Sequence, residues 1–92
     1  MNVTAIQEFK VAEQCVVAEY AGGLAVFDTR INEFYMLNEV GHLVWSAVEA
    51  GKSVDTIVDE IIEEYDADAA QVRTDVIVVI EDMKRNGLLE RA

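Results

Sequence analysis

The sequence contains no proline, one cysteine and one histidine among its 92 residues. The lone Cys15 excludes an internal disulfide, and no cluster of cysteine and histidine supplies the three or four ligands of a zinc site. No segment approaches the roughly 18 uninterrupted apolar residues of a membrane span, and the first residues do not resemble a secretion signal. We therefore expect a cytoplasmic protein that needs no metal or other cofactor.

Basic residues are also scarce. Seven lysines and arginines stand against 18 aspartates and glutamates, which gives a formal net charge of -11. Nucleic-acid binding draws much of its strength from basic side chains that contact phosphate groups. The composition therefore argues against nucleic acids and anionic membranes as partners, and it favours a basic peptide or a basic protein surface.

The residues that are present suffice for one small core. Hydrophobic residues make up 52% of the chain, and a chain of this length buries roughly 60–65% of the surface that its unfolded form exposes. No linker or internal repeat divides the sequence. We expect a single domain over residues 1–92, in which residues 1–10 form a loosely attached arm because they show no clear periodicity.

Three short segments have the composition of β-strands. Residues 15–20, 24–28 and 33–37 are rich in β-branched, aromatic and other apolar residues, and the segments between them are short and typical of turns. Connections of this length predict an antiparallel sheet whose first and third strands are its edges. The third segment, EFYML, places large apolar side chains on both faces of an edge strand, which favours its coverage by a partner strand.

After Leu37 the spacing of apolar residues changes to that of α-helices. Three helices are predicted, and each begins after a good N-cap residue, namely Asn38, Ser53 and Asp68. The third helix ends in NGLL (86–89), which fits a Schellman motif with Leu88 folded back on Met83. The sequence thus predicts an α+β fold, a three-stranded antiparallel sheet followed by three helices.

No residue has the neighbours that catalysis requires. His42 lacks an evident nucleophile or orienting carboxylate, and Cys15 lacks a base, so we expect structural roles for both and no enzymatic activity. Trp45 is either an interaction hot spot or a core residue, and we favour the core. The run VIVVI (76–80) exceeds what one helix face needs, so this helix is either buried on several sides or borders a groove for an apolar ligand.

Two long segments, GGLAVFDTRINEFYMLNEVGHLVWSAVEAG and VDEIIEEYDADAAQVRTDVIVVIEDMKRNGLLE, resemble the PqqD-like family of peptide-recognition domains. The similarity covers about residues 11–90. Its most specific part is the aromatic strand that runs into Leu37 and Asn38, followed by Gly41 and Trp45. The resemblance implies a winged-helix-like, non-catalytic recognition element in the biosynthesis of ribosomally made, post-translationally modified peptides (RiPPs).

The resemblance also implies a binding mode. Family members bind the leader region of a precursor peptide as an added strand on the third β-strand, and its side chains enter a groove beside the third helix. Carried over to this sequence, the peptide-binding residues are Glu33, Phe34, Tyr35, Met36, Val72, Asp75, Val76, Val79, Asp82 and Met83.

Stand-alone members of the family present the leader to a separate processing enzyme. We favour a lasso-peptide leader peptidase as that enzyme, because basic leaders are common in lasso pathways and would suit the acidic chain. One alternative is a peptide chaperone for a radical enzyme of the pyrroloquinoline quinone type. Others are a winged-helix regulator that binds nucleic acid, which the charge opposes, and a structural subunit that dimerises through the same strand edge.

Overall fold

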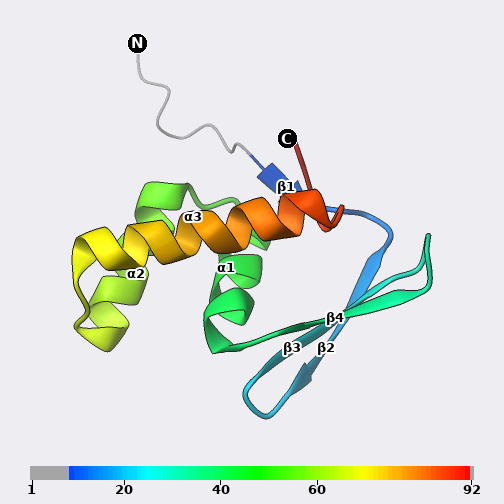
Figure 1. Ribbon diagram of the computed structural model, residues 1–92, viewed down its shortest axis with the longest axis horizontal. Coiled ribbons are helices and arrows are strands. Elements are labelled where there is room, and N and C mark those ends of the chain that lie inside the picture. Colours follow the sequence, from blue (N-terminus) through cyan, green and yellow to red (C-terminus); the bar gives the residue numbers. More distant parts are fainter. Residues whose placement is uncertain (1–8, 92) are drawn as a thin grey trace.

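The structure is a computed structural model, and it describes residues 9–91. A three-stranded sheet lies at one end of the molecule, and three helices pack together beside it (Figure 1). This confirms the predicted α+β fold and adds two short strands. The elements in chain order are β1 (Phe9–Val11), β2 (Cys15–Tyr20), β3 (Gly23–Asp28), β4 (Glu33–Leu37), α1 (Glu39–Glu49), α2 (Val54–Tyr65), α3 (Ala69–Arg85) and β5 (Leu89–Arg91).

Strands β2, β3 and β4 form an antiparallel sheet in that order, so β2 and β4 are its edges, as predicted. The register pairs Leu24 with Leu37 and Val26 with Tyr35. Leu24 and Val26 are buried, and α1 packs against β3 on this side. The face of the sheet that carries them is therefore the core-facing side, which we call the inner face.

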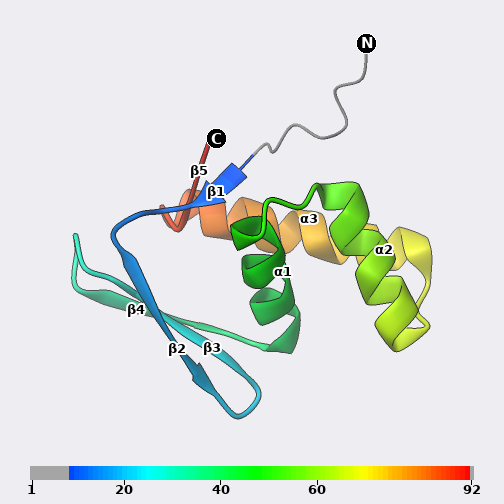
Figure 2. The ribbon, with the colours of Figure 1, turned by 180° about the vertical axis from the view of Figure 1, so that it is seen from behind.

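Strands β1 and β5 pair antiparallel as a second, two-stranded sheet beside the end of α3 (Figure 2). Phe9 pairs with Arg91 and Lys10 with Glu90. The prediction that residues 1–10 form a loosely attached arm is therefore wrong for Phe9 and Lys10, and residues 1–8 lie outside the described residues. The partner strand is at the other end of the sequence, so no local pattern around Phe9 indicated the pairing.

All three helices begin at the predicted N-caps. Each cap side chain accepts a hydrogen bond from the backbone N–H three residues later, and the caps are Asn38, Ser53 and Asp68. At the third helix the side chain of Gln71 donates to Asp75 at 2.9 Å. Asn38 allows β4 to run into α1 without a connecting loop, which fixes the end of β4 against the helical part of the molecule.

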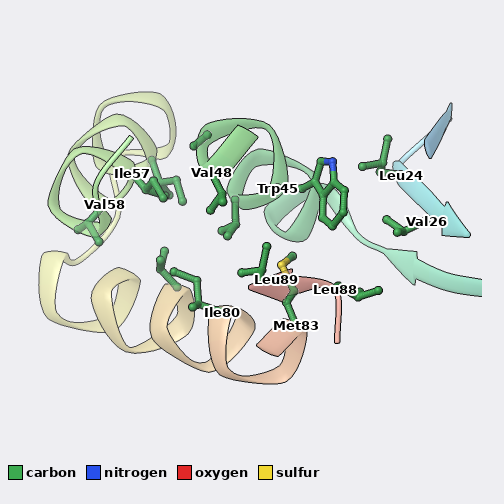
Figure 3. Packing of buried hydrophobic residues seen from close by; sticks show 14 of the residues in the cluster. Leu24, Val26, Trp45, Val48, Ile57, Val58, Ile80, Met83, Leu88 and Leu89 are labelled. Carbon is green, nitrogen blue, oxygen red and sulfur yellow. The ribbon is translucent and has the colours of Figure 1, made fainter. Parts of the chain in front are cut away.

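The end of α3 is the predicted Schellman motif. The Leu88 N–H donates to the Met83 carbonyl at 2.8 Å, and the Gly87 N–H donates to the Lys84 carbonyl at 3.0 Å. Gly87 has φ +77°, a conformation that glycine adopts without steric cost. The turn folds Leu88 back into the core, where it is buried against the inner face of the sheet and the last turns of α3 (Figure 3).

Trp45 is the largest buried side chain, with 2% of its surface exposed, and it lies between α1 and the inner face of the sheet near Leu24 and Val26 (Figure 3). This confirms its predicted place in the core. Its indole Nε1–H is buried and has no hydrogen-bond acceptor among the described residues. Trp45 therefore stabilises the junction between sheet and helices through packing, not through a hydrogen bond.

The structure also tests the predictions made for the burial of α3 and for the role of Cys15. Ile77 and Val78 are 43% and 53% exposed, so the interpretation of α3 as a helix buried on several sides is wrong. Burial, with the nearby Asp28 carboxylate, raises the pKa of the Cys15 thiol, which agrees with a structural role for this residue. Within residues 9–91 no helix has the length and apolar content needed to cross a membrane.

Candidate peptide-binding site

Strand β4 has one strand neighbour, β3, among the described residues, so its outer edge is open. The N–H and C=O groups on the open side of an edge strand are available to pair with another extended chain. Phe34 and Met36 are 67% and 63% exposed, whereas Tyr35 and Leu37 are half-buried on the inner face. The backbone of β4 therefore offers a pairing edge flanked by large apolar side chains.

A groove of about 150 Å³ lies between this edge and the C-terminal half of α3. Met83 and Leu88 are buried beneath it, held in place by the Schellman turn. Asp82 lies in its wall and accepts a hydrogen bond from Arg85 Nη1 at 2.6 Å. The groove is thus largely apolar with a polar edge, and its lining residues are Tyr35, Leu37, Val79, Asp82, Met83, Asn86 and Leu88.

A second hollow, of about 180 Å³, lies farther along α3, between that helix, the start of α1 and the end of α2. The two hollows are neighbours, because Val79 lines the first and Val76, one helical turn away, lines the second. Partial burial and the nearby Glu39 carboxylate raise the pKa of the Tyr65 phenol, so this side chain stays neutral beside the acid. The second hollow is lined by Glu39, Val40, Ile61, Tyr65, Ala67, Val72, Asp75 and Val76.

The structure places all six predicted α3 residues along these hollows. Val79, Asp82 and Met83 line the groove beside β4, and Val72, Asp75 and Val76 line the second hollow. Of the predicted β4 residues, Tyr35 lines the groove, whereas Glu33, Phe34 and Met36 do not. Phe34 and Met36 lie on the opposite face of the sheet. Contact between any of these ten residues and a peptide stays a prediction.

Sequence reasoning missed three lining residues of the groove, namely Leu37, Asn86 and Leu88. Each had a signal. Leu37 lies two residues after Tyr35 and so on the same face of the strand, Asn86 follows Asp82 and Met83 by one helical turn, and the Schellman pattern already placed Leu88 on Met83.

Another hollow, of about 460 Å³, lies elsewhere, between α1 and α2. Three glutamates line it together with apolar residues such as Leu43 and Ile57. None of the ten predicted residues lines it, and it borders no open strand edge. We therefore place the candidate site at β4 and α3.

The position of β4 depends on a close approach at Gly23. A Cβ atom at this position would overlap the carbonyl oxygen of Leu37, at the end of β4. The Tyr20 hydroxyl donates a hydrogen bond to the same oxygen at 3.0 Å. Only glycine allows the backbones to come this close, so Gly23 and Tyr20 together fix the end of the open strand.

Comparisons with known proteins agree with this geometry. The family model described as coenzyme PQQ synthesis protein D (PqqD) matches residues 23–89. No curated protein sequence matches the chain. Two solved structures share the fold. TbiB1 in complex with the TbiA(beta) leader peptide is 28% identical, with a TM-score of 0.82 over 88% of this chain and 94% of TbiB1. Lasso peptide synthetase B1 complexed with the leader peptide is 23% identical, with a TM-score of 0.83 over 90% of this chain and 98% of that chain.

The matched residues run from the start of β3 to the start of β5. They therefore include the open strand, the Asn38 cap and the whole of α3, which are the elements that form the candidate site. Because the match covers well over half of the sequence, the chain belongs to the PqqD family.

Proposed function

We propose that this protein is a RiPP recognition element that binds the leader region of a precursor peptide as an added strand on β4. The observation that carries this proposal is the open edge of β4 beside a largely apolar groove. In such a mode, backbone hydrogen bonds supply affinity and alternate side chains supply specificity. TbiB1, which was solved with a leader peptide bound and has a similar fold at 28% identity, supports the proposal.

When a leader strand extends the sheet, the inner face determines which leader side chains contact the protein most closely. A strand paired with β4 directs every second side chain toward this face, where the groove lies. Val79, Met83 and Leu88 would contact an apolar side chain there. Glu39 and Asp75 in the second hollow would attract a basic residue farther along the leader. The ten predicted residues thus divide between the pairing edge of β4, the groove beside it and the second hollow.

The protein acts on the leader by holding it, not by chemistry. Capture raises the effective concentration of the precursor at a separate processing enzyme. We propose a lasso-peptide leader peptidase as this enzyme, in keeping with the acidic charge and with the fold shared with lasso peptide synthetase B1. The second candidate is a peptide chaperone for a radical enzyme of the pyrroloquinoline quinone pathway, which the description of the matching family favours.

Titration of a labelled leader peptide tests the proposal. We expect saturable binding by fluorescence polarisation, and we expect a proline in the pairing stretch of the leader to weaken it by about tenfold, because proline donates no hydrogen bond to β4. A proline placed outside that stretch serves as the control. The proposal fails if the native and both proline-substituted leaders bind equally well. Leaders from both candidate pathways, titrated side by side, distinguish the two processing enzymes.

Two neighbouring valines on α3 test the groove. Val79 is half-buried in the groove, whereas Val78 is 53% exposed and lines neither hollow. We expect Val79→Asp to weaken leader binding about tenfold, because a bound apolar side chain would then face a carboxylate. Val78→Asp changes the charge and the helix propensity equally and should bind the leader as the wild type does. Equal losses in the two variants would place the leader outside the groove.

A further inference from the structure

The hollow between α1 and α2 is larger than either hollow along α3. Its volume is about 460 Å³, compared with about 150 Å³ for the groove beside β4 and about 180 Å³ for the second hollow. We call it the third hollow, and its lining residues come from α1 and α2, which lie side by side in front of α3 in Figure 2. Its apolar residues are Leu43, Ala47, Ile57 and Ile61, and its acidic residues are Glu60, Glu63 and Glu64.

The third hollow continues the path of the two hollows along α3. Ile61 lines both the second and the third hollow. On α1, Val40 lines the second hollow and Leu43, which is three residues further along on the same side of the helix, lines the third. Because Asn38 joins β4 directly to α1, this path begins where the open strand ends. A peptide that leaves the edge of β4 at Leu37 therefore passes the second hollow before it reaches the third.

Unpaired acidic charge increases along the same path. In the groove beside β4, Asp82 forms an ion pair with an arginine of α3 at 2.6 Å. In the third hollow, Glu60 forms an ion pair with Lys52 at 2.8 Å. Glu63 and Glu64 form no ion pair with any residue in the range 9–91. The third hollow therefore offers two carboxylates to a basic ligand.

The apolar residues of the third hollow narrow the choice of ligand. Ala47, Ile57 and Ile61 are buried residues of the core, and Leu43 is 37% exposed. Lysine and arginine side chains have apolar stems and charged tips, so they can cover such a surface while they reach its carboxylates. A second copy of this chain suits the hollow poorly, because it would bring the same excess of acidic charge.

A leader paired with β4 can reach the third hollow with its N-terminal part. A strand that continues the antiparallel pattern of this sheet runs opposite to β4, and antiparallel pairing is the slightly more stable arrangement. Since β4 runs toward α1, the N-terminal side of such a leader passes α1. Leu43 and Ala47 lie about 6–12 Å along α1 from Glu39, a distance that about two to four extended residues span.

We propose that the third hollow binds lysine or arginine residues of the leader that precede the stretch paired with β4 by about two to four residues. The charged tips meet Glu63 and Glu64, and the stems cover Leu43 and Ile61. This inference rests on the proposed function. It names the class of leader that the domain prefers, one in which a basic segment precedes the pairing stretch and adds its affinity to that of the paired strand.

Three synthetic peptides test the inference by fluorescence polarisation on the full chain. All contain the pairing stretch of the leader, as mapped by the proline substitutions. The first has nothing added, the second has two lysines and a Gly-Ser spacer before the stretch, and the third has the same spacer and lysines after it. At about 0.05 M salt we expect the second peptide to bind about fivefold more tightly than the third, and this difference should vanish at about 0.5 M salt.

Two double variants with the same change of net charge locate the effect. Glu63→Gln combined with Glu64→Gln removes the two unpaired carboxylates of the third hollow. Glu49→Gln combined with Asp59→Asn removes two exposed carboxylates of the same helices that line none of the three hollows. We expect the first pair to abolish the fivefold difference and the second pair to retain it. Both double variants should bind the peptide without lysines as the wild type does.

Three results would overturn the inference. The first is equal affinity of the wild type for the two lysine peptides, and the second is a difference that persists when Glu63 and Glu64 are both replaced. If that same variant binds the leader peptidase more weakly or dissociates a dimer, the hollow belongs to the enzyme or to a second copy. The third is an equal loss in both double variants, which would indicate attraction by overall charge. Failure of the wild type to bind the peptide without lysines would instead refute the proposed function, so the two failures are distinguishable.

Discussion

Replacing Gly23 with alanine should lower the free energy of unfolding by about 3 kcal/mol and remove most of the leader affinity. The added methyl group would overlap the Leu37 carbonyl oxygen, a backbone atom that no side-chain rotation can move away. This overlap can be removed only if the end of β4 separates from β3, which also breaks the hydrogen bond from Tyr20 to Leu37. The strand that we propose to pair with the leader would lose its fixed position.

The adjacent glycine supplies the control. Gly22 has φ +96°, and an added Cβ atom there would have nothing within 4 Å. Gly22→Ala should therefore cost only the left-handed conformation, about 1–2 kcal/mol, and leave leader affinity unchanged once the protein is folded. Urea unfolding and fluorescence polarisation on both variants separate backbone overlap from conformational strain. If Gly23→Ala binds leader like the wild type, the end of β4 is not part of the site.

Replacing Trp45 with alanine should be still more costly, about 4 kcal/mol, because it removes the largest buried side chain from the junction of α1 with the sheet. Domains of this size have a total stability of roughly 5–15 kcal/mol, so a substantial unfolded fraction is expected at moderate temperature. Trp45 is the only tryptophan. Urea unfolding followed by far-ultraviolet circular dichroism measures the loss without depending on its fluorescence.

Trp45→Phe makes this prediction specific. The buried indole N–H has no acceptor within the described part of the chain, so phenylalanine sacrifices no hydrogen bond and removes an uncompensated donor. We expect this variant to lose only about 1–2 kcal/mol, from the smaller ring. A loss as large as that of the alanine variant would mean that the N–H is bonded after all, and the packing interpretation would be wrong.

The elements that sequence predicted well are those with local causes. The caps at Asn38, Ser53 and Asp68 act on N–H groups three residues away, and the turns between strands are too short to allow other pairings. The β1–β5 pairing was missed because its two strands lie far apart in the sequence, so neither strand carries a local signal for the other. The interpretation of α3 as a helix buried on several sides was wrong for a different reason. A run of apolar residues such as Ile77 and Val78 does not show which sides of a helix other elements cover.

The candidate site shows the same division. The spacing of Val72, Val76, Val79 and Met83 and the family resemblance together identified a side of α3 that borders the two hollows. The faces of β4 could not be assigned, because its side chains are large and apolar on both sides and alternation alone does not say which side is inward. Only the register with β3, where the buried Val26 lies opposite Tyr35, shows which side of β4 faces the groove and which side carries the exposed Phe34 and Met36.

The pairing of Phe9 with Arg91 brings the two ends of the described chain side by side. Entry and exit are then separated by a single interstrand spacing, roughly 5 Å. A domain with this geometry can be spliced into a loop of a host protein as an insertion, with little strain on either the host or the guest. Such an insertion would leave the edge of β4 free, because β1 and β5 form a sheet separate from that of β2, β3 and β4.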